Sequence, residues 1–308
     1  MKFTYDIAAT YLDNFERGPQ LDLAPAIPAT ELVDFLGKKV NSRLGIAAGL
    51  LLNAKWIEGY AARGWDLLTY KTVRSSAREC YPPPNWVFVD ADDGAGPVCA
   101  MDDLPEDSST ISSAVCFGMP SMPPEFWRED IARAKAALSE GQMLIVSVVA
   151  SPEPDWDAVQ VADDYAQCAA WAAEAGADVI EANFSCPNVS TCDGQLFQQP
   201  ADSQLVTQMV REAIGDLPYI AKIGRILQRE DAEALLAAVH ESVDALAMTN
   251  SIASTVVKPD GGYLFDGERR GICGAATLHA SVEQTAMLAG LIETEQYQLE
   301  LIGVGGAA

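Results

Sequence analysis

The sequence predicts an α/β protein with the fold of a (β/α)8 TIM barrel. Three observations favour this class. Short apolar runs alternate with amphipathic helical runs along the chain of 308 residues, as in proteins with a parallel sheet. Seven such β-then-α units follow one another in series. Polar residues suited to binding a ligand stand at the carboxyl ends of the predicted strands, where barrel active sites form.

Each predicted strand is short and apolar, and a helical run separates it from the next. We expect strands at about residues 45–48, 67–71, 143–149, 178–183, 219–223, 244–249 and 299–303. The helical runs show apolar residues at the spacing of one helix face. They are "NAKWIEGYAARG", "PEFWREDIARAKAALSEG", "DAVQVADDYAQCAAWAAEAG", "DSQLVTQMVREAIG", "REDAEALLAAVHES" and the run from about His279 to Glu295.

The domain organisation follows from this repeat. We expect residues 1–308 to form a single domain, with long loops at about 74–124 and 251–278. Long loops in a compact domain are uncommon unless they are functional, and both follow strand ends. The eighth strand of a full barrel has no counterpart in the sequence, so either it lies beyond Ala308, which we expect, or the barrel closes in some other way.

Composition excludes several classes of function. The chain has 20 basic and 44 acidic residues, a net charge of −24, which argues against nucleic acid or anionic membrane as a partner. No signal peptide or apolar stretch of membrane-spanning length occurs, so we expect a cytoplasmic protein. Seven scattered Cys indicate reduced thiols, and with two His and no C-x-x-C pair we expect no metal site.

Lysines and asparagines mark the predicted rim of the barrel. Lys71 and Lys222 end the second and fifth strands, Asn183 and Asn188 follow the fourth, and Asn250 follows the sixth. A lysine can snorkel at a strand end and an asparagine can cap a turn, which are the alternatives. Several at one rim favour a bound anion or electron-rich ring with imide-like edges. The glycines of "GVGG" at 303–306 favour a phosphate site, because barrels often bind phosphate after the seventh strand.

The motif "NFSCPNV", residues 183–189, resembles the dihydroorotate dehydrogenase family of flavin-dependent barrels. It matches the soluble class, whose pattern is N-L-S-C-P-N-V and whose catalytic base is a cysteine, with only Phe184 in place of Leu. The class that docks on membranes has Ser at the base position, where this chain has Cys186. The resemblance extends in order over about residues 40 to 306.

The resemblance implies FMN-dependent oxidation of dihydroorotate to orotate in pyrimidine biosynthesis. In such enzymes a thiolate, here Cys186, takes a proton from C5 while a hydride leaves C6 for flavin N5. A thiol titrates near 8.5, so it can act as a base where the pocket favours the thiolate. Outside this motif, Cys186 would be read as a small buried apolar residue.

The resemblance also implies binding residues. Those implied for the flavin are Ala47, Ala48, Gly49, Lys71, Thr72, Asn183, Lys222, Gly271, Gly274, Gly305 and Gly306. Those implied for the substrate are Lys71, Phe117, Gly118, Met119, Asn183, Ser185, Asn188, Asn250 and Ser251. A homodimer or an electron-transfer partner subunit is the expected assembly.

One loop departs from the family pattern. The family has N-S-M-G-L-P-N before the third strand, with both Asn touching the substrate, where this chain has "VCFGMPS". Val115 and Ser121 therefore replace two hydrogen-bonding side chains. Two alternatives stay open: a divergent dihydropyrimidine oxidoreductase with another substrate, and a non-catalytic barrel or fragment.

Overall fold

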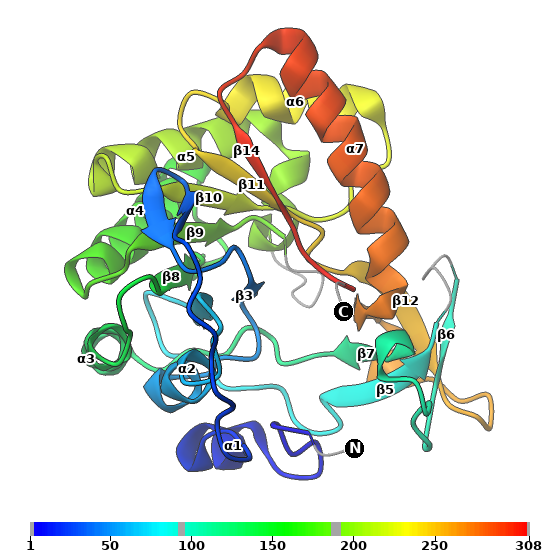
Figure 1. Cartoon of the computed structure of the whole chain (residues 1–308). Helices are drawn as coiled ribbons and strands as arrows, with labels where there is room; N and C mark the ends of the chain where they lie inside the picture. Colours follow the sequence, from blue (N-terminus) through cyan, green and yellow to red (C-terminus); the bar gives the residue numbers. More distant parts are fainter. Residues whose placement is uncertain (1–2, 92–95, 186–191, 307–308) are drawn as a thin grey trace. The chain divides into compact units, whose positions relative to one another are not determined.

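The computed structural model describes residues 3–91, 96–185 and 192–306, in which strands and helices alternate (Figure 1). The chain divides into two compact units. Unit 1 consists of Met1–Glu79, Pro120–Ala182 and Gln208–Ile220. Unit 2 consists of Cys80–Met119, Asn183–Thr207 and Ala221–Ala308. The single-domain organisation of residues 1–308 stays a prediction.

Unit 1 holds the first strands of the main parallel sheet. The pairs β3–β4, β4–β8 and β8–β9 are all parallel. Every residue of β4, β8 and β9 is buried, because strands of a parallel sheet are covered on both faces. The strands are β3 (Gly45–Ile46), β4 (Leu67–Val73), β8 (Met143–Val148) and β9 (Val179–Asn183).

One predicted helix follows each of these strands in the chain. They are α2 (Ala54–Ala61), α3 (Pro124–Ala136), α4 (Ala158–Glu174) and α5 (Pro200–Ile214). Asp157 and Gln160 form a capping box that starts α4, which satisfies the first free N–H groups of this helix. Before the repeat come the helix α1 (Tyr11–Arg17) and an antiparallel hairpin of β1 (Val33–Phe35) and β2 (Lys38–Val40).

Unit 2 contains the remaining predicted strands. β11 and β14 pair in parallel, and a hydrogen bond from Ile223 N to Ala247 O (2.9 Å) joins β10 to β11. The sheet order is β14-β11-β10-β9-β8-β4-β3, so all seven predicted strands are present. The strands are β10 (Tyr219–Lys222), β11 (Ala245–Met248) and β14 (Glu300–Gly303), and the helices are α6 (Arg229–Val239) and α7 (Leu278–Glu295).

Unit 2 also contains a second sheet that the sequence pattern did not reveal. The two predicted long loops supply five strands that form a small closed barrel in the order β12-β13-β7-β5-β6. Its core includes Val89, Ala114, Val256 and Ile272. The strands are β5 (Trp86–Asp90), β6 (Val98–Ala100), β7 (Ser112–Val115), β12 (Ile252–Val257) and β13 (Arg269–Gly274).

Short 3-10 turns connect several of these elements. They are η1 (Ser108–Thr110), η2 (Cys192–Gln198), η3 (Phe265–Gly267) and η4 (Ala275–Thr277). In the part of the chain that the structure describes, no helix has the length and apolar character needed to cross a membrane.

Candidate active site

The predicted substrate residues of unit 2 form a hydrogen-bonded cluster at the carboxyl ends of β9 and β11. The Asn250 side-chain amide donates to the backbone oxygen of Ser185 and to Asn183 Oδ1, the latter at 3.5 Å. The backbone N–H of Ser185 also donates to Asn183 Oδ1, at 3.1 Å. All the strands of a parallel barrel end at the same face, so these two asparagines meet there although 67 residues separate them.

The segment from Phe117 to Met119 joins this cluster. Asn183 Nδ2 lies 3.6 Å from Met119 Sδ, a weak hydrogen bond between two buried side chains. Gly118 and Met119 both have positive φ, at 75° and 50°. A Cβ on Gly118 would lie 2.8 Å from the ring of Tyr81, so only glycine lets the segment pass this ring.

The two positions that depart from the family loop have defined surroundings. Val115 ends β7, where its backbone lies opposite Trp86 on one side and Gly271 on the other. In unit 1, Ser121 is buried, and its hydroxyl donates to Met122 O (2.8 Å) and accepts from Arg74 N (3.1 Å). The Ser121 hydroxyl therefore serves the local backbone.

Unit 1 holds the predicted flavin residues that precede the third strand of the repeat. Lys71 lies on β4 and is 5% exposed, and its ammonium group is 3.5 Å from Pro120 O. Burying a cation this deeply is costly unless an anion or dipole meets it. Thr72 is hydrogen-bonded to Ser147 (3.0 Å). Segment 47–49 is half-buried, and Leu51 just after it accepts a hydrogen bond from Lys71 N (2.9 Å).

Three predicted glycines of unit 2 have positive φ, a backbone conformation that favours glycine. Gly274, Gly305 and Gly306 have φ of 90°, 96° and 70°, values that side chains rarely allow. A Cβ on Gly306 would lie 2.6 Å from Leu278 Cβ and 3.0 Å from Leu278 N, at the first residue of α7. The end of β14 therefore lies directly against the N-terminus of this helix.

The N-terminus of α7 suits an anion. Its N-cap residue, Thr277, makes no capping hydrogen bond, because its hydroxyl instead donates to Gly274 O (2.8 Å). The N–H of Leu278 donates to Ala275 O, and the dipole of α7 attracts phosphate to this end of the helix. Gly305 and Gly306 let the backbone after β14 pack against Thr277 and Leu278, and a glycine turn beside a helix N-terminus fits the phosphate of a flavin nucleotide.

Lys222, the other predicted lysine, ends β10 and is 2% exposed. Gly271 lies within β13 of the small barrel, between Ala253 and Val115 in register. The predicted convergence of Lys71 and Lys222 on one ring stays a prediction. Cys186 and Asn188 lie outside the described residues, so their predicted roles stay predictions too.

Two buried cysteines are unsuited to the role of base. Burial raises the pKa of the Cys116 thiol above its ordinary value, and the neighbouring Arg270 guanidinium only partly offsets this. Burial also raises the pKa of Cys168, which lies in α4. Both groups are therefore neutral thiols at physiological pH, as expected of packing residues.

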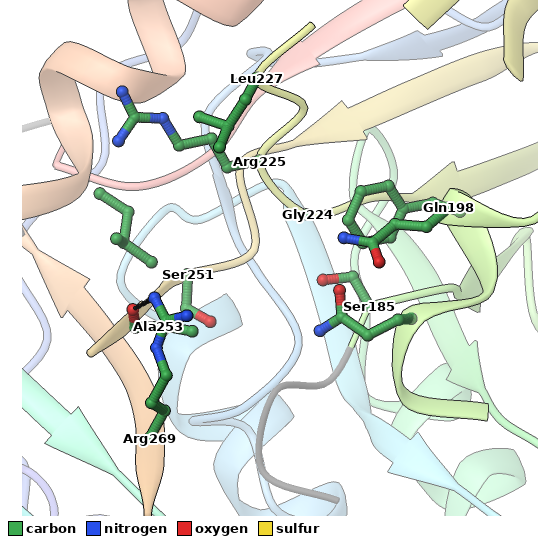
Figure 2. Close-up of a pocket in the computed structure, with 11 residues that line it drawn as sticks. Ser185, Gln198, Gly224, Arg225, Leu227, Ser251, Ala253 and Arg269 are labelled. Carbon is green, nitrogen blue, oxygen red and sulfur yellow. Dashed lines mark hydrogen bonds between the residues drawn. The ribbon is translucent and has the colours of Figure 1, made fainter. Parts of the chain in front are cut away.

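The structure adds functional candidates that the sequence pattern did not indicate. The Gln284 side chain of α7 accepts from Ile226 N and donates to Gly224 O, both at 2.8 Å, and so fixes the segment after β10. Thr249, next to Asn250, is fully buried, and its hydroxyl has no partner among the described residues. A pocket of about 430 Å³ within unit 2 adjoins the cluster and is lined by Ser185, Ser251 and Arg269 among others (Figure 2).

Comparisons with known proteins agree with this geometry. The family model for dihydroorotate dehydrogenase matches residues 118–308. A dihydroorotate dehydrogenase of Dictyostelium discoideum is 32% identical over 323 residues, covering 98% of this chain and 86% of that protein. This chain belongs to the dihydroorotate dehydrogenase family. A dihydroorotate dehydrogenase (quinone) of Delftia acidovorans is 23% identical over 286 residues, covering 89% and 74% of the two chains.

A solved structure supports the fold. DHODH from Eimeria tenella in complex with ferulenol matches with a TM-score of 0.68 at 16% identity, covering 92% of this chain and 76% of that one. This likeness and the parallel sheet confirm the predicted α/β barrel fold. Dihydroorotate dehydrogenases are FMN-dependent oxidoreductases acting on CH–CH groups, so the predicted cofactor and enzyme class are confirmed at the level of the family.

Proposed function

We propose that this chain oxidises dihydroorotate to orotate, with Cys186 as the general base. The observation that carries this proposal is the cluster of Asn183, Ser185 and Asn250, held together by hydrogen bonds at the carboxyl ends of two strands. Asn183 and Ser185 also begin the motif that contains Cys186. Membership of the dihydroorotate dehydrogenase family supports the same reaction.

The reaction removes one hydrogen from each of C5 and C6 of the substrate and creates a double bond between them. The Cys186 thiolate takes the C5 proton and becomes a thiol. FMN, when bound, supplies the acceptor for the hydride from C6. Asn183 and Asn250 each offer amide donors and acceptors to the imide edge of the pyrimidine, which holds C5 toward the base.

Residues near the cofactor have electrostatic roles in this proposal. Gly305 and Gly306 pack beside the N-terminus of α7, where we expect the flavin phosphate to bind. Lys71 and Lys222 are buried lysines at strand ends, at 5% and 2% exposure. A positive charge beside the flavin stabilises the reduced, anionic ring, which favours electron transfer from the substrate.

The test is anaerobic stopped-flow reduction of the purified protein loaded with FMN, followed by the loss of flavin absorbance near ~450 nm. Dihydroorotate should bleach the parent protein. Cys186→Ala should slow the reduction by about 10²–10⁴-fold, the range for losing a general base, with little change in substrate binding. Cys186→Ser should keep some activity, shifted to higher pH.

Cys99→Ala is the matched control, because the Cys99 thiol on β6 of the small barrel donates to the backbone oxygen of Ala100 and has no predicted role in the reaction. This variant should be reduced at the rate of the parent. Equal rates for Cys186→Ala and the parent would show that Cys186 is a packing residue. A parent protein that binds FMN but is not reduced by dihydroorotate would overturn the substrate assignment and leave the fold intact.

A second candidate is the oxidation of another dihydropyrimidine. It is favoured by Val115, whose side chain has no hydrogen-bonding group. It is also favoured by Ser121, whose hydroxyl is hydrogen-bonded to the backbone of Met122 and Arg74. Restoring both amides with Val115→Asn and Ser121→Asn should tighten orotate binding if dihydroorotate is the substrate. Unchanged orotate affinity in this double variant favours the second candidate.

The setting of the reaction stays a prediction. The free thiols among the described residues fit a reducing compartment, which supports the cytoplasm. A homodimer or an electron-transfer partner subunit is tested by light scattering of the purified protein alone and after mixing with a candidate partner.

A further inference from the structure

A pocket of about 430 Å³ opens within unit 2 beside the substrate cluster (Figure 2). Figure 2 shows Ser185 and Gln198 on one side and Ser251, Ala253 and Arg269 on the other. The pocket has room for one pyrimidine acid, since pockets of this size hold small organic ligands. Its lining offers hydroxyl, amide and guanidinium groups.

The pocket shares residues with the substrate cluster. Ser185 lines the pocket, and its backbone oxygen accepts the hydrogen bond from Asn250. Ser251, which also lines the pocket, directly follows Asn250 in the chain. A ligand in the pocket would therefore contact Ser185 and Ser251, which adjoin the groups that bind the pyrimidine in the proposed function.

Gly224 leaves room for the side chains of Ser185 and Phe197 in the wall of the pocket. A Cβ at this position would lie 2.7 Å from Ser185 Oγ and 2.8 Å from the ring of Phe197. The two hydrogen bonds from Gln284 hold Gly224 and Ile226 in place. The pocket wall is thus fixed by buried contacts.

Two arginines line the pocket, and their surroundings differ. Arg225 lies 3.7 Å from Glu283 of α7, and Figure 2 shows its guanidinium directed away from Ser185. Arg269 donates one hydrogen bond to Ala253 O, and no carboxylate within residues 3–91, 96–185 and 192–306 pairs with it. The Arg269 guanidinium has five N–H donors, so most of them are available to a ligand.

The position of Arg269 relates it to the altered loop. Gly271 stands directly opposite Val115 in the antiparallel pair of β13 and β7. Arg269 is two residues before Gly271 on β13, so Arg269 and Val115 belong to the same face of this sheet. Glycine leaves no side chain between them. Val115 is the position at which the family loop has an amide for the substrate.

We propose that this pocket binds the carboxylate of the substrate, first as it enters and then in the bound complex, with Arg269 as the main contact. The inference rests on the proposed function, because it names dihydroorotate as the anion. A planar guanidinium binds a carboxylate with two parallel hydrogen bonds. A local positive site is needed because the chain carries a net charge of −24, which repels an anionic substrate at a distance.

The first experiment measures binding of orotate and uracil to the FMN-loaded protein by calorimetry at low salt. The two ligands share the ring, and only orotate carries the carboxylate. Arg269→Gln should weaken orotate binding by about 10-fold, the loss expected for one charge-assisted pair. Arg269→Lys should fall between the parent and Arg269→Gln, since it keeps the charge and loses the planar fork. Uracil binding should be the same in all three.

Control variants remove the same charge elsewhere. Arg225→Gln should change orotate binding by less than about 3-fold, because Glu283 already offsets this charge. Arg229→Gln should have no effect, because Arg229 pairs with Glu233 on α6 and does not line the pocket.

The second experiment measures flavin reduction by dihydroorotate against salt concentration. In the parent protein the second-order rate constant should fall as salt rises, and in Arg269→Gln it should be lower and respond less to salt. The reduction rate at saturating substrate should match the parent, because capture precedes the chemical step.

The outcomes separate the two proposals. If the parent is reduced normally and Arg269→Gln retains the orotate affinity and salt response of the parent, the inference is wrong and the proposed function stands. If orotate binds in an Arg269-dependent way but the parent is not reduced, the proposed function is wrong and the anion site stands. If orotate does not bind to the parent, both are overturned.

Discussion

Replacing Gly306 with alanine tests the phosphate site at the most constrained position that the structure offers. The new methyl group would lie 2.6 Å from Leu278 Cβ and 3.0 Å from both the Cα and N of Leu278. Two of these atoms belong to the backbone of the first residue of α7, so a side-chain rotation cannot relieve the contact. The methyl group would push the turn at 305–306 away from the N-terminus of α7, where we expect the FMN phosphate.

The size of the effect follows from the contacts that are lost. One hydrogen bond to a charged group contributes about 1.5–3 kcal/mol, which corresponds to roughly 10- to 100-fold in Kd. The positive φ of 70° adds a separate cost of about 1–2 kcal/mol for any residue with a Cβ. This second cost lowers the free energy of unfolding rather than the FMN affinity of the folded protein.

The assay is a fluorescence titration of the flavin-free protein with FMN and with riboflavin. FMN affinity should fall by about 10- to 100-fold in Gly306→Ala, while riboflavin affinity stays within about 3-fold, because riboflavin lacks the phosphate. Gly303→Ala, three residues earlier at the end of β14, is the control, since a Cβ there would meet nothing within 4 Å. Parallel losses of FMN and riboflavin, or no loss of FMN, would refute the reasoning.

Three further predictions concern residues around the cluster. Gln284→Leu removes the side-chain partners of Gly224 O and Ile226 N, so the free energy of unfolding measured in urea should fall by about 2–5 kcal/mol. The control is Val282→Ala at an exposed position of the same helix, which should change the free energy of unfolding by less than about 0.5 kcal/mol. Gly118→Ala should weaken orotate binding in calorimetry by at least about 10-fold, because its Cβ would meet the Tyr81 ring; Tyr81→Ala in the same chain should restore part of this affinity. Gly224→Ala should displace Ser185 and Phe197 and weaken orotate binding, while FMN affinity is retained.

The main sheet was predictable because its signal is local. Each strand is an apolar run buried on both faces, and each helix has an apolar stripe, so short windows of sequence show both. The ends differ by a few residues: β3 stops at Ile46, and β4 continues to Val73. The glycines at 305–306 were chosen from their position after the last strand, and their role at the flavin phosphate stays a prediction.

The small barrel was not predictable because its signal is not local. β12 pairs with β6 although about 160 residues separate Val256 from Val98, and β6 has only three residues. No short window of sequence records such a pairing. Gln284 and Arg269 were missed for a related reason. A polar residue on a helix or in a charged loop is read as solvent-facing until the fold places a backbone or a pocket beside it.

The register of β13 with β7 gives the departure from the family loop a physical meaning. Val115 and Arg269 belong to one face of the sheet. Gly271, the β13 residue that pairs with Val115, has no side chain on this face. If Arg269 has taken over recognition of the carboxylate from the amide missing at position 115, the two positions act on the same ligand group. Their effects are then not additive. Arg269→Gln should weaken orotate binding by about 10-fold in the parent but by less than about 3-fold in a chain that already carries Val115→Asn. Equal losses in both backgrounds would show that the two positions act independently, and that Val115 reflects a different substrate.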